Sequence, residues 1–428
     1  MGNILKNQLI AVNYIEFTKM NMHVYPFIIS EKKEGMSLLV ALFQNQSVNM
    51  LGDITKEGWK EILKIDVLLC PVCKNKVIPK CGTKKVWHFA HSQDSNCLPY
   101  HEAETEYHLL GKKKLYHWFQ SFKEEPILEK YIRGIEQRPD IYLPLQNHAV
   151  EFQCVSMKKE IFCRRINGYK SLNMESDWIF AKKRLKKIHN ELYSIQSGDL
   201  TAAKKDLNGN LYLYYFCPLQ QKFLLVHNII PLTSNKILGK VQSFSLKDLR
   251  GLNDVKKGSV DSKCLITQWM NQKKSWRKTA FKNISPASMY LKKVLYYHHK
   301  SLTLFSPLAG VPTRDFYHFD TAAFIWQSYL LYYIEKLPNT FLFSQIESEF
   351  SRLIFKRIFS TRSFPYLNEN FKTALHGYLT FLEEEKVIVQ IHENFYKKLD
   401  AISYPATLDE AFQLDKIFSL RGGFFDFV

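Results

Sequence analysis

A cluster of cysteine and histidine residues constrains the local fold of this chain more than any other feature. Cys70 and Cys73 are separated by two residues, so one tight turn can bring both thiolates to the same metal ion. A tetrahedral site needs two further ligands, and the sequence offers His88, His91 and Cys97. Four of these five residues would complete a closed structural zinc site that holds the fold. A Cys-x-x-Cys pair alone also fits a redox motif or none, but the βαβ surroundings of a thioredoxin-like motif are missing.

Length and composition predict a folded protein with several domains. The chain has 428 residues, of which 46% are hydrophobic and 14% aromatic, and this is too apolar for a disordered protein. One hydrophobic core rarely organises so long a chain, so we expect two or three domains. No apolar run approaches the roughly 20 residues that span a bilayer, and the N-terminal residues do not read as a secretory signal. We therefore expect a cytoplasmic protein without membrane insertion.

The formal net charge of +18 comes from Lys and Arg residues scattered along the whole length. Such a charge favours polyanionic partners, and nucleic acid and an anionic membrane surface both meet that requirement. A merely solubilising charge is the third interpretation. Charge alone does not choose among the three.

The N-terminal part of the chain is expected to contain a small module behind an irregular segment. Residues 1–35 show no clear period, whereas a cleaner strand at 37–43 follows Met36. We expect translation to begin at or near Met36, with residues 1–35 as a non-native or disordered extension. Residues 36–100 then form an N-terminal strand and zinc-finger-like module, with a short helix at 56–63.

The next part of the chain has the pattern of an α/β core, which we place at residues 101–185. The apolar spacing predicts a helix, three short strands, a second helix and a further strand, at 101–119, 127–135, 140–145, 149–155, 158–172 and 178–181. Residues 186–245 are expected to extend this core with strands, including a hairpin of 211–216 and 222–226.

The C-terminal domain, residues 246–428, is expected to be mainly helical. A lysine-rich connector at 245–282 leads into it. Amphipathic helices are predicted, for example, at 324–335, 343–359 and 371–384.

Acidic residues recur where such a core brings its strands together. Asp140 enters one predicted strand, Glu151 lies on the next, and Glu106 lies on the preceding helix. Because side chains alternate along a strand, Gln153 shares a face with Glu151. Carboxylate oxygens hold Mg²⁺ or Mn²⁺, which neutralises phosphate charge and lowers the pKa of attacking water. The set therefore predicts phosphodiester hydrolysis, although each residue alone also fits a solvated surface charge.

Basic and aromatic residues accompany these acids. Arg165 and Tyr169 lie four residues apart on a predicted helix and therefore share one of its faces. We expect them, together with Arg138 beside the acidic strand, to bind a DNA phosphate near the acidic centre.

These motifs resemble the competence protein CoiA family of bacteria that take up DNA. The resemblance covers residues 36–184. It rests on Cys70-x-x-Cys73, His88-Phe-Ala-His91, Glu104-x-Glu106-Tyr-His108, Gln137-Arg-Pro-Asp140-Ile141, Glu151-Phe-Gln153-Cys154 and the Arg165-to-Tyr169 spacing. It implies a zinc-finger region, a restriction-endonuclease-like core of the PD-(D/E)xK kind with α/β architecture, and a divergent C-terminal domain.

The resemblance also implies roles for individual residues. Asp140 and Glu151 match the acidic metal ligands, and Glu106 matches the acidic residue of the first helix. Gln153 takes the place of the lysine that the wider nuclease pattern carries, although the family itself commonly has Gln there. A Gln amide can orient a water molecule, but it is not a charged partner for a base.

The implied biological setting is natural transformation, in which incoming single-stranded DNA is processed or recombined. The first hypothesis is a Mg²⁺-dependent deoxyribonuclease. The second is a DNA-binding recombination mediator that keeps the nuclease fold without turnover, which Gln153 favours. The third is an adaptor whose aromatic C-terminal helices dock recombination proteins such as a RecA-type recombinase.

Overall fold

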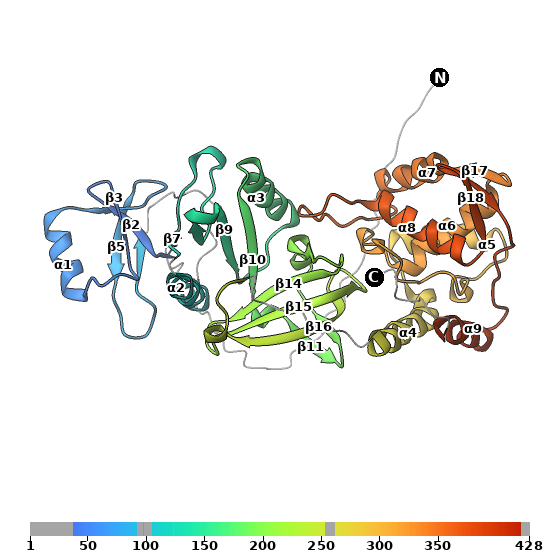
Figure 1. Cartoon of the computed structure of the whole chain (residues 1–428), viewed down its shortest axis with the longest axis horizontal. Coiled ribbons are helices and arrows are strands. Elements are labelled where there is room, and N and C mark those ends of the chain that lie inside the picture. Colours follow the sequence, from blue (N-terminus) through green and yellow to red (C-terminus); the bar gives the residue numbers. More distant parts are fainter. Residues whose placement is uncertain (1–36, 92–96, 98–104, 123, 253–261, 421–428) are drawn as a thin grey trace, which may run out of the picture.

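The protein is described from a computed structural model that covers residues 37–91, 97, 105–122, 124–252 and 262–420. The expected extension at residues 1–35 and the start at Met36 lie outside these residues. Figure 1 shows three bodies in a row: a small sheet with helix α1, a large sheet with helices α2 and α3, and a helical C-terminal part. Within the described ranges, no helix is both long enough and apolar enough to cross a bilayer.

The N-terminal body is an antiparallel six-stranded sheet. Its strands are β1 (Ser37–Leu38), β2 (Val40–Phe43), β3 (Gln46–Asn49), β4 (Leu68–Leu69), β5 (Lys76–Lys80) and β6 (His88–His91), in the order β1-β6-β5-β4-β2-β3. Helix α1 (Lys56–Ile65) confirms the predicted helix, and the Thr55 side chain caps it by accepting from the Gly58 N–H. The strand predicted at 37–43 is divided at Leu39, because β1 pairs with β6 whereas β2 pairs with β3 and β4.

The middle body is built on one ten-stranded mixed sheet. Its main path has the order β11-β12-β16-β15-β14-β10-β9-β8-β7, and β13 pairs with β14. Strand β10 runs parallel to β9 and to β14, and the other pairs are antiparallel. The strands are β7 (Ile127–Leu128), β8 (Ile141–Leu143), β9 (His148–Gln153), β10 (Glu175–Ala181), β11 (Lys186–His189), β12 (Leu192–Ser194), β13 (Lys204–Lys205), β14 (Leu211–Cys217), β15 (Lys222–Pro231) and β16 (Lys236–Ser245).

The strand predicted at 127–135 is wrong in its length. Strand β7 ends after Leu128, since Glu129 adopts a left-handed backbone conformation with φ of 49°. A short 3₁₀ turn, Arg133–Ile135, occupies the rest of the predicted strand. The chain thereby turns the Glu129 side chain into the interior, where it is 2% exposed.

Two helices cover opposite faces of the middle sheet. Helix α2 (Glu106–Gln120) shares a hydrophobic cluster with Val150 and Phe152, whereas helix α3 (Lys159–Ser171) shares one with Trp178 and Phe180. Helix α2 approaches its strand closely, because a Cβ atom at Gly111 would lie 1.9 Å from a ring carbon of Phe152. Only glycine admits this contact between α2 and β9.

The C-terminal region differs from the sequence prediction in two respects. The expected connector at 245–282 contains a helix, α4 (Ser262–Thr279), and the helical region contains a three-stranded sheet. The elements are α5 (Pro286–Tyr296), α6 (Ala323–Lys336), β17 (Thr340–Leu342), α7 (Phe343–Phe355), α8 (Phe371–Glu384), β18 (Ile388–His392), β19 (Phe395–Lys398) and α9 (Leu408–Leu420). The helices predicted within 324–384 are confirmed as α6, α7 and α8.

From α6 to β19 the chain follows the arrangement of a winged helix. The order is helix, strand, helix, helix, strand, strand, with the sheet order β17-β19-β18. Helix α8 occupies the place that a recognition helix has in such a module. Half of its fourteen residues are buried, and the backbone of Gly377 faces the carbonyl of Arg314 at a distance that excludes any Cβ atom. Its face is therefore covered by the chain itself.

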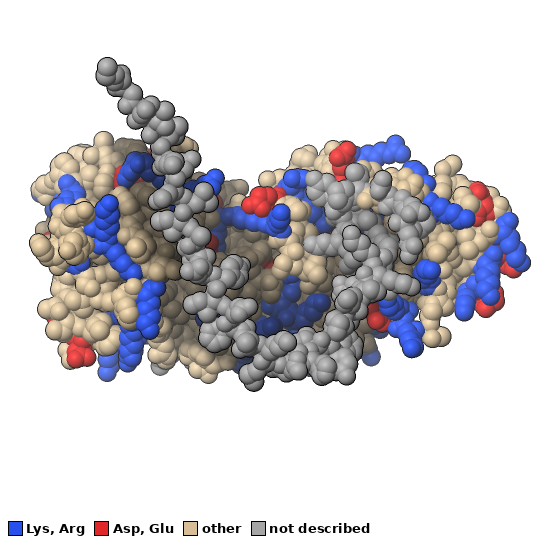
Figure 2. Space-filling model, turned by 180° about the vertical axis from the view of Figure 1, so that it is seen from behind, with Lys and Arg blue, Asp and Glu red and all other residues tan. Residues whose placement is uncertain are grey.

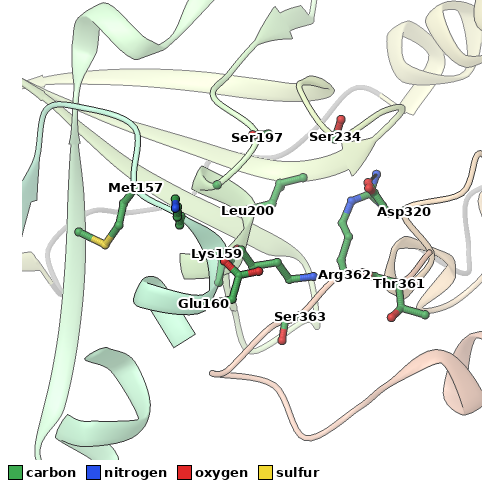
Figure 3. Close-up of a pocket in the computed structure, with 13 residues that line it drawn as sticks. Met157, Lys159, Glu160, Ser197, Leu200, Ser234, Asp320, Thr361, Arg362 and Ser363 are labelled. Carbon is green, nitrogen blue, oxygen red and sulfur yellow. Dashed lines mark hydrogen bonds and ion pairs between the residues drawn. The ribbon is translucent and has the colours of Figure 1, made fainter. Parts of the chain in front are cut away.

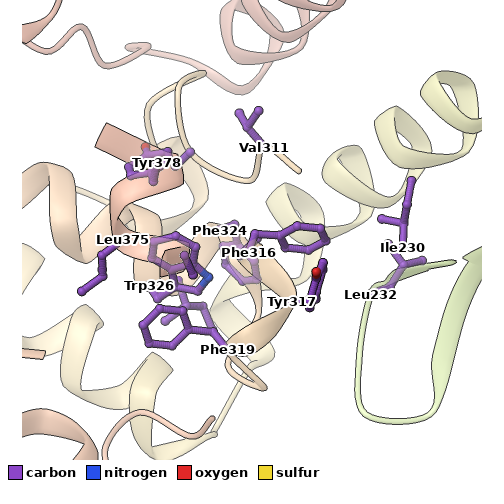
Figure 4. Close-up of a cluster of buried hydrophobic side chains, with 14 of the residues drawn as sticks. Ile230, Leu232, Val311, Phe316, Tyr317, Phe319, Phe324, Trp326, Leu375 and Tyr378 are labelled. Atoms are coloured by element: carbon purple, nitrogen blue, oxygen red, sulfur yellow. The ribbon is translucent and has the colours of Figure 1, made fainter. Parts of the chain in front are cut away.

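The middle and C-terminal bodies share one hydrophobic core. Ile230 near the end of β15 and Leu232 just after it belong to the same cluster of buried side chains as Phe316, Tyr317 and the aromatic residues of α6. Figure 4 shows these two aliphatic residues facing this aromatic group. The C-terminal body therefore packs directly on the sheet.

We predict that Gly111→Ala lowers the free energy of unfolding by roughly 1–3 kcal/mol, because the new methyl group would press α2 away from Phe152. Helix propensity alone predicts the opposite sign, because Ala stabilises a helix by up to about 1 kcal/mol relative to Gly. A destabilised variant would therefore report the close contact. Gly134→Ala is the control, as nothing lies within 4 Å of its Cβ position. Urea unfolding followed by Trp fluorescence measures both, and an unchanged or stabilised Gly111→Ala protein would contradict the close contact.

Candidate functional site

The candidate site lies at one end of the middle sheet. The antiparallel register pairs Ile141 of β8 with Val150 of β9, so Asp140, just before β8, comes beside Glu151. Helix α2 begins at the same end, and β9 and β10 both finish there because they run parallel. The two acids that the sequence singled out are therefore neighbours in the fold.

Asp140 is held by groups from α2 and from the β9 backbone. Its Oδ2 atom accepts the Phe152 N–H at 2.8 Å and lies 3.3 Å from Nε2 of His108, and Oδ1 lies 3.7 Å from Nζ of Lys112. Burial alone would raise the pKa of this carboxyl. The charges of His108 and Lys112 and the two hydrogen bonds outweigh burial, and the pKa falls below its ordinary value.

Glu151 is held from the other side, by α3. Its Oε1 atom accepts from the Arg165 guanidinium and from the Tyr169 hydroxyl, and the residue is 2% exposed. Burial raises the pKa of Glu151 to about 7. The charge of Arg165 lowers this pKa, and the negative charge of the Asp140 carboxylate raises it. The same sheet end thus holds one firmly ionised carboxyl and one that titrates near neutrality.

The other predicted site residues lie around this pair. Gln153 is buried, and its amide donates to the Val155 carbonyl at 2.9 Å. Tyr169 is fully buried, and Arg165 also donates to the Arg138 carbonyl at 3.2 Å, so both residues hold Glu151 from within the protein. Glu106 is exposed at the first turn of α2, and no contact between described residues links it to either acid.

A buried ion network next to Asp140 was not predicted. Lys112 on α2 is fully buried, and its Nζ lies 2.5 Å from Oε1 of Glu129. Glu129 also lies 3.6 Å from the Arg138 guanidinium, and its Oε2 accepts the Leu39 N–H at 3.1 Å. The last bond reaches the N-terminal sheet at the point where β1 and β2 separate.

One sequence signal pointed to part of this network. Lys112 follows His108 by four residues, so both lie on the helix face that meets Asp140. Glu129 gave no such signal, because a carboxylate between Leu128 and Lys130 reads as a solvated charge.

The predicted metal cluster is brought together in the N-terminal body. The ligand atoms of Cys70, Cys73, His91 and Cys97 all lie within 4.8 Å of one another. Sγ of Cys73 lies 3.4 Å from Nε2 of His91, and the sulfurs of Cys70 and Cys97 are 4.0 Å apart. The fifth candidate, His88, stays outside the group, where its Nδ1 lies 2.8 Å from the Val86 carbonyl.

A tight turn explains the position of the first two sulfurs. The Cys70 N–H donates to Asn75 and the Lys74 N–H donates to Cys70, while the Val72 N–H points at the Cys70 sulfur at 3.4 Å. Burial raises the pKa of the Cys97 thiol to about 12, and the neighbouring Cys70 and Cys73 add to that rise. Three cysteines and one histidine in this arrangement form a donor set that suits tetrahedral zinc.

Three family models cover most of the chain. They describe the N-terminal, nuclease-like and C-terminal domains of competence protein CoiA and match residues 52–99, 104–257 and 266–412. A curated relative, competence protein CoiA of Bacillus subtilis (strain 168), is 30% identical over 280 residues, which are 64% of this chain and 74% of the relative. The chain belongs to the competence protein CoiA family. No solved structure matches it.

The family matches assign the two candidate sites to different domains. Asp140, Glu151 and the network around them lie within the nuclease-like match, and Cys70, Cys73, His91 and Cys97 lie within the N-terminal match. The hydrogen bond from the Leu39 N–H to Glu129 joins the N-terminal sheet to the nuclease-like domain. This CoiA-family chain therefore combines an acidic pair in its nuclease-like domain with a separate Cys/His cluster in its N-terminal domain.

A pocket of about 350 Å³ lies where the nuclease-like and C-terminal domains meet. Figure 3 shows Lys159 and Glu160 of α3 on one side and the segment from Thr361 to Ser363 on the other. Lys159 donates to the Thr361 carbonyl at 3.2 Å, and Arg362 pairs with Asp320 at 3.0 Å. Because Lys159 of the nuclease-like domain donates to Thr361 of the C-terminal domain beside it, the pocket belongs to the domain junction.

We predict that Glu129→Gln costs more stability than Lys112→Met. Gln removes the carboxylate that Lys112 and Arg138 share and leaves Lys112 with the more distant Asp140, at 3.7 Å, and this loss of a buried charge partner costs about 3–5 kcal/mol. Met removes one cation and leaves Glu129 paired with Arg138, so the loss is smaller. Urea unfolding of both variants gives the ranking, and the reverse order would show that the network does not depend on Glu129.

Proposed function

We propose that this CoiA-family protein is a Mg²⁺- or Mn²⁺-dependent deoxyribonuclease acting on incoming DNA during natural transformation. The observation that carries the proposal is the neighbouring pair of carboxyls, the partly exposed Asp140 and the buried Glu151, with pKa values shifted in opposite directions inside a nuclease-like domain. Neighbouring acids with such opposed shifts are typical of catalytic sites. A core of the PD-(D/E)xK kind is part of the same proposal.

Asp140 and Glu151 would supply the oxygen ligands for the cation. When bound, such a cation neutralises phosphate charge and lowers the pKa of water. Two carboxylates suit Mg²⁺, which commonly binds one or two carboxylates and completes its shell with water and substrate phosphate. Arg165, Tyr169 and Arg138 keep Glu151 in place, and a direct phosphate contact stays a prediction for them.

A basic segment at the same end of the sheet supports DNA as the substrate. Lys182 and Lys183 follow β10, whose Phe180 pairs with Gln153, and Lys186 and Lys187 are also exposed. Arg184 between them is buried, with its Nε 3.1 Å from Asp199, which fixes the segment. Figure 2 shows Lys and Arg side chains spread over one face of the molecule, including its recessed middle. Such a surface suits the phosphates of DNA.

A DNA-binding mediator without turnover is the second candidate. It is favoured by Gln153, whose amide is bonded to Val155, and by Arg165, which already contacts the Glu151 carboxylate. A protein of this kind would hand single-stranded DNA to recombination proteins such as a RecA-type recombinase.

We predict that purified protein cleaves labelled DNA with Mg²⁺ or Mn²⁺, and that Asp140→Asn and Glu151→Gln each reduce cleavage roughly 100-fold or more. Both substitutions keep the side-chain shape, and circular dichroism checks the fold. Asp66→Asn, at an exposed carboxylate in the N-terminal body, is the control and should keep full activity. Products that persist in both site variants would sink the nuclease assignment.

Binding separates the two candidates. A mediator would give no Mg²⁺-dependent products, and its salt-sensitive affinity for single strands would survive Asp140→Asn and Glu151→Gln.

We also propose that Cys70, Cys73, His91 and Cys97 bind a structural zinc ion. With all four positions filled by protein, the ion would hold the N-terminal domain together and would not activate water.

Metal analysis tests this assignment. We predict that the protein as purified carries a single zinc ion per chain and that Cys97→Ser removes it. His88→Ala and Cys81→Ser are the matched controls and should retain zinc, because neither residue belongs to the cluster. Zinc that is lost with His88→Ala and kept with Cys97→Ser would overturn the ligand set.

A further inference from the structure

A second pocket lies next to the acidic pair. It has a volume of about 230 Å³, and its lining includes Val72, Tyr131, Met157, Ile161, Arg164 and Arg165. Arg165 is the link to the site, since it lines the pocket and its guanidinium contacts Glu151. Whatever occupies the pocket therefore lies one side chain away from the candidate metal ligand.

The lining of this pocket combines apolar, aromatic and charged side chains. Val72, Met157 and Ile161 give apolar walls, Tyr131 offers an aromatic ring, and all four are partly exposed. Arg138, Arg164 and Arg165 add three positive charges to the lining and Glu136 adds one negative charge, so the lining is positive on balance. A ligand that matches this lining has flat apolar faces next to anionic groups, which describes a nucleobase on its phosphate backbone.

The size of the pocket limits the ligand further. A volume of about 230 Å³ lies below the roughly 300–1,000 Å³ of pockets for drug-sized ligands, which suits one nucleobase and not a base pair. A duplex would have to be opened before a base entered. Single strands offer unpaired bases at no such cost.

We infer that this pocket binds one unpaired nucleobase of the DNA strand next to the phosphate at the acidic site, and so selects single-stranded DNA. The inference rests on the proposed function and adds that the protein binds a base of the DNA substrate as well as its phosphate. Val72 gives the N-terminal domain a share in this site, because it lies between Cys70 and Cys73 in the turn of the Cys/His cluster.

The test measures affinity and not cleavage. Fluorescence anisotropy without added Mg²⁺ gives the Kd of the full chain for a labelled single-stranded oligonucleotide and for the same sequence as a duplex. We predict that the wild type prefers the single strand. Tyr131→Ala should weaken single-strand binding roughly 10- to 100-fold, the range expected from losing one base-stacking contact, and leave duplex binding nearly unchanged.

A second variant fills the pocket instead of opening it. Ile161→Trp places a large ring in the space for the base and should also abolish the preference for single strands. Matched controls are Tyr297→Ala and Leu172→Trp, at residues that are 68% and 40% exposed and away from the pocket lining. The first controls for loss of a tyrosine and the second for a new tryptophan at the end of the same helix.

The outcomes separate this inference from the proposed function. If both pocket variants keep the single-strand preference, or lose single-strand and duplex affinity equally, the base pocket is refuted while nuclease activity can stand. If the wild type binds neither form of DNA, the inference and the proposed function both fail.

Discussion

The buried ion pair between Lys112 and Glu129 is the interaction on which the rest of the candidate site depends. Two charges taken out of water are costly, and the cost is offset only when every partner is present. Here Glu129 also receives the Leu39 N–H and faces Arg138, while Lys112 lies within 3.7 Å of Asp140. Helix α2, the end of β7 and the N-terminal sheet must therefore adopt their positions together. Each charged group needs its own partner at hydrogen-bonding distance, whereas apolar side chains can pack in several ways, so the network favours one arrangement of these elements.

The same network explains why two adjacent acids behave differently. Asp140 faces the cationic groups of α2 and accepts a backbone N–H, so its ionised form is favoured despite burial. Glu151 lies deeper, against α3, where burial and the Asp140 charge raise its pKa more than the charge of Arg165 and the hydrogen bond from Tyr169 lower it. The difference arises from the two helices on opposite faces of one strand pair. A cation arriving at this end of the sheet would find one carboxylate already ionised and a second that loses its proton near pH 7.

The sequence predicted what depends on local spacing and missed what depends on distant contacts. The Cys-x-x-Cys turn, the starts of α1 and α3 and the order of the acids along β8 and β9 are visible as short patterns. The shortening of β7 is not, because Glu129 turns inward only to meet Lys112 and Leu39, which lie far from it in the chain. The strands β17, β18 and β19 are too short for a clear period. Helix α4 was hidden by its lysines, although its Lys273 is buried against Asp415.

The C-terminal body limits where the proposed DNA contacts can lie. Its winged-helix arrangement would suggest that α8 reads a groove, but that helix carries a single lysine and ends in acidic residues. The segment around Arg314 and the 3₁₀ turn Phe316–His318 cover it, and its core continues into β15 of the nuclease-like domain. A helix so placed supports the sheet and is not free to enter a groove. Under the proposed function, contacts with DNA would then fall to surfaces beside the acidic pair, where the exposed lysines after β10 would supply charge and the pocket beside Arg165 would supply shape.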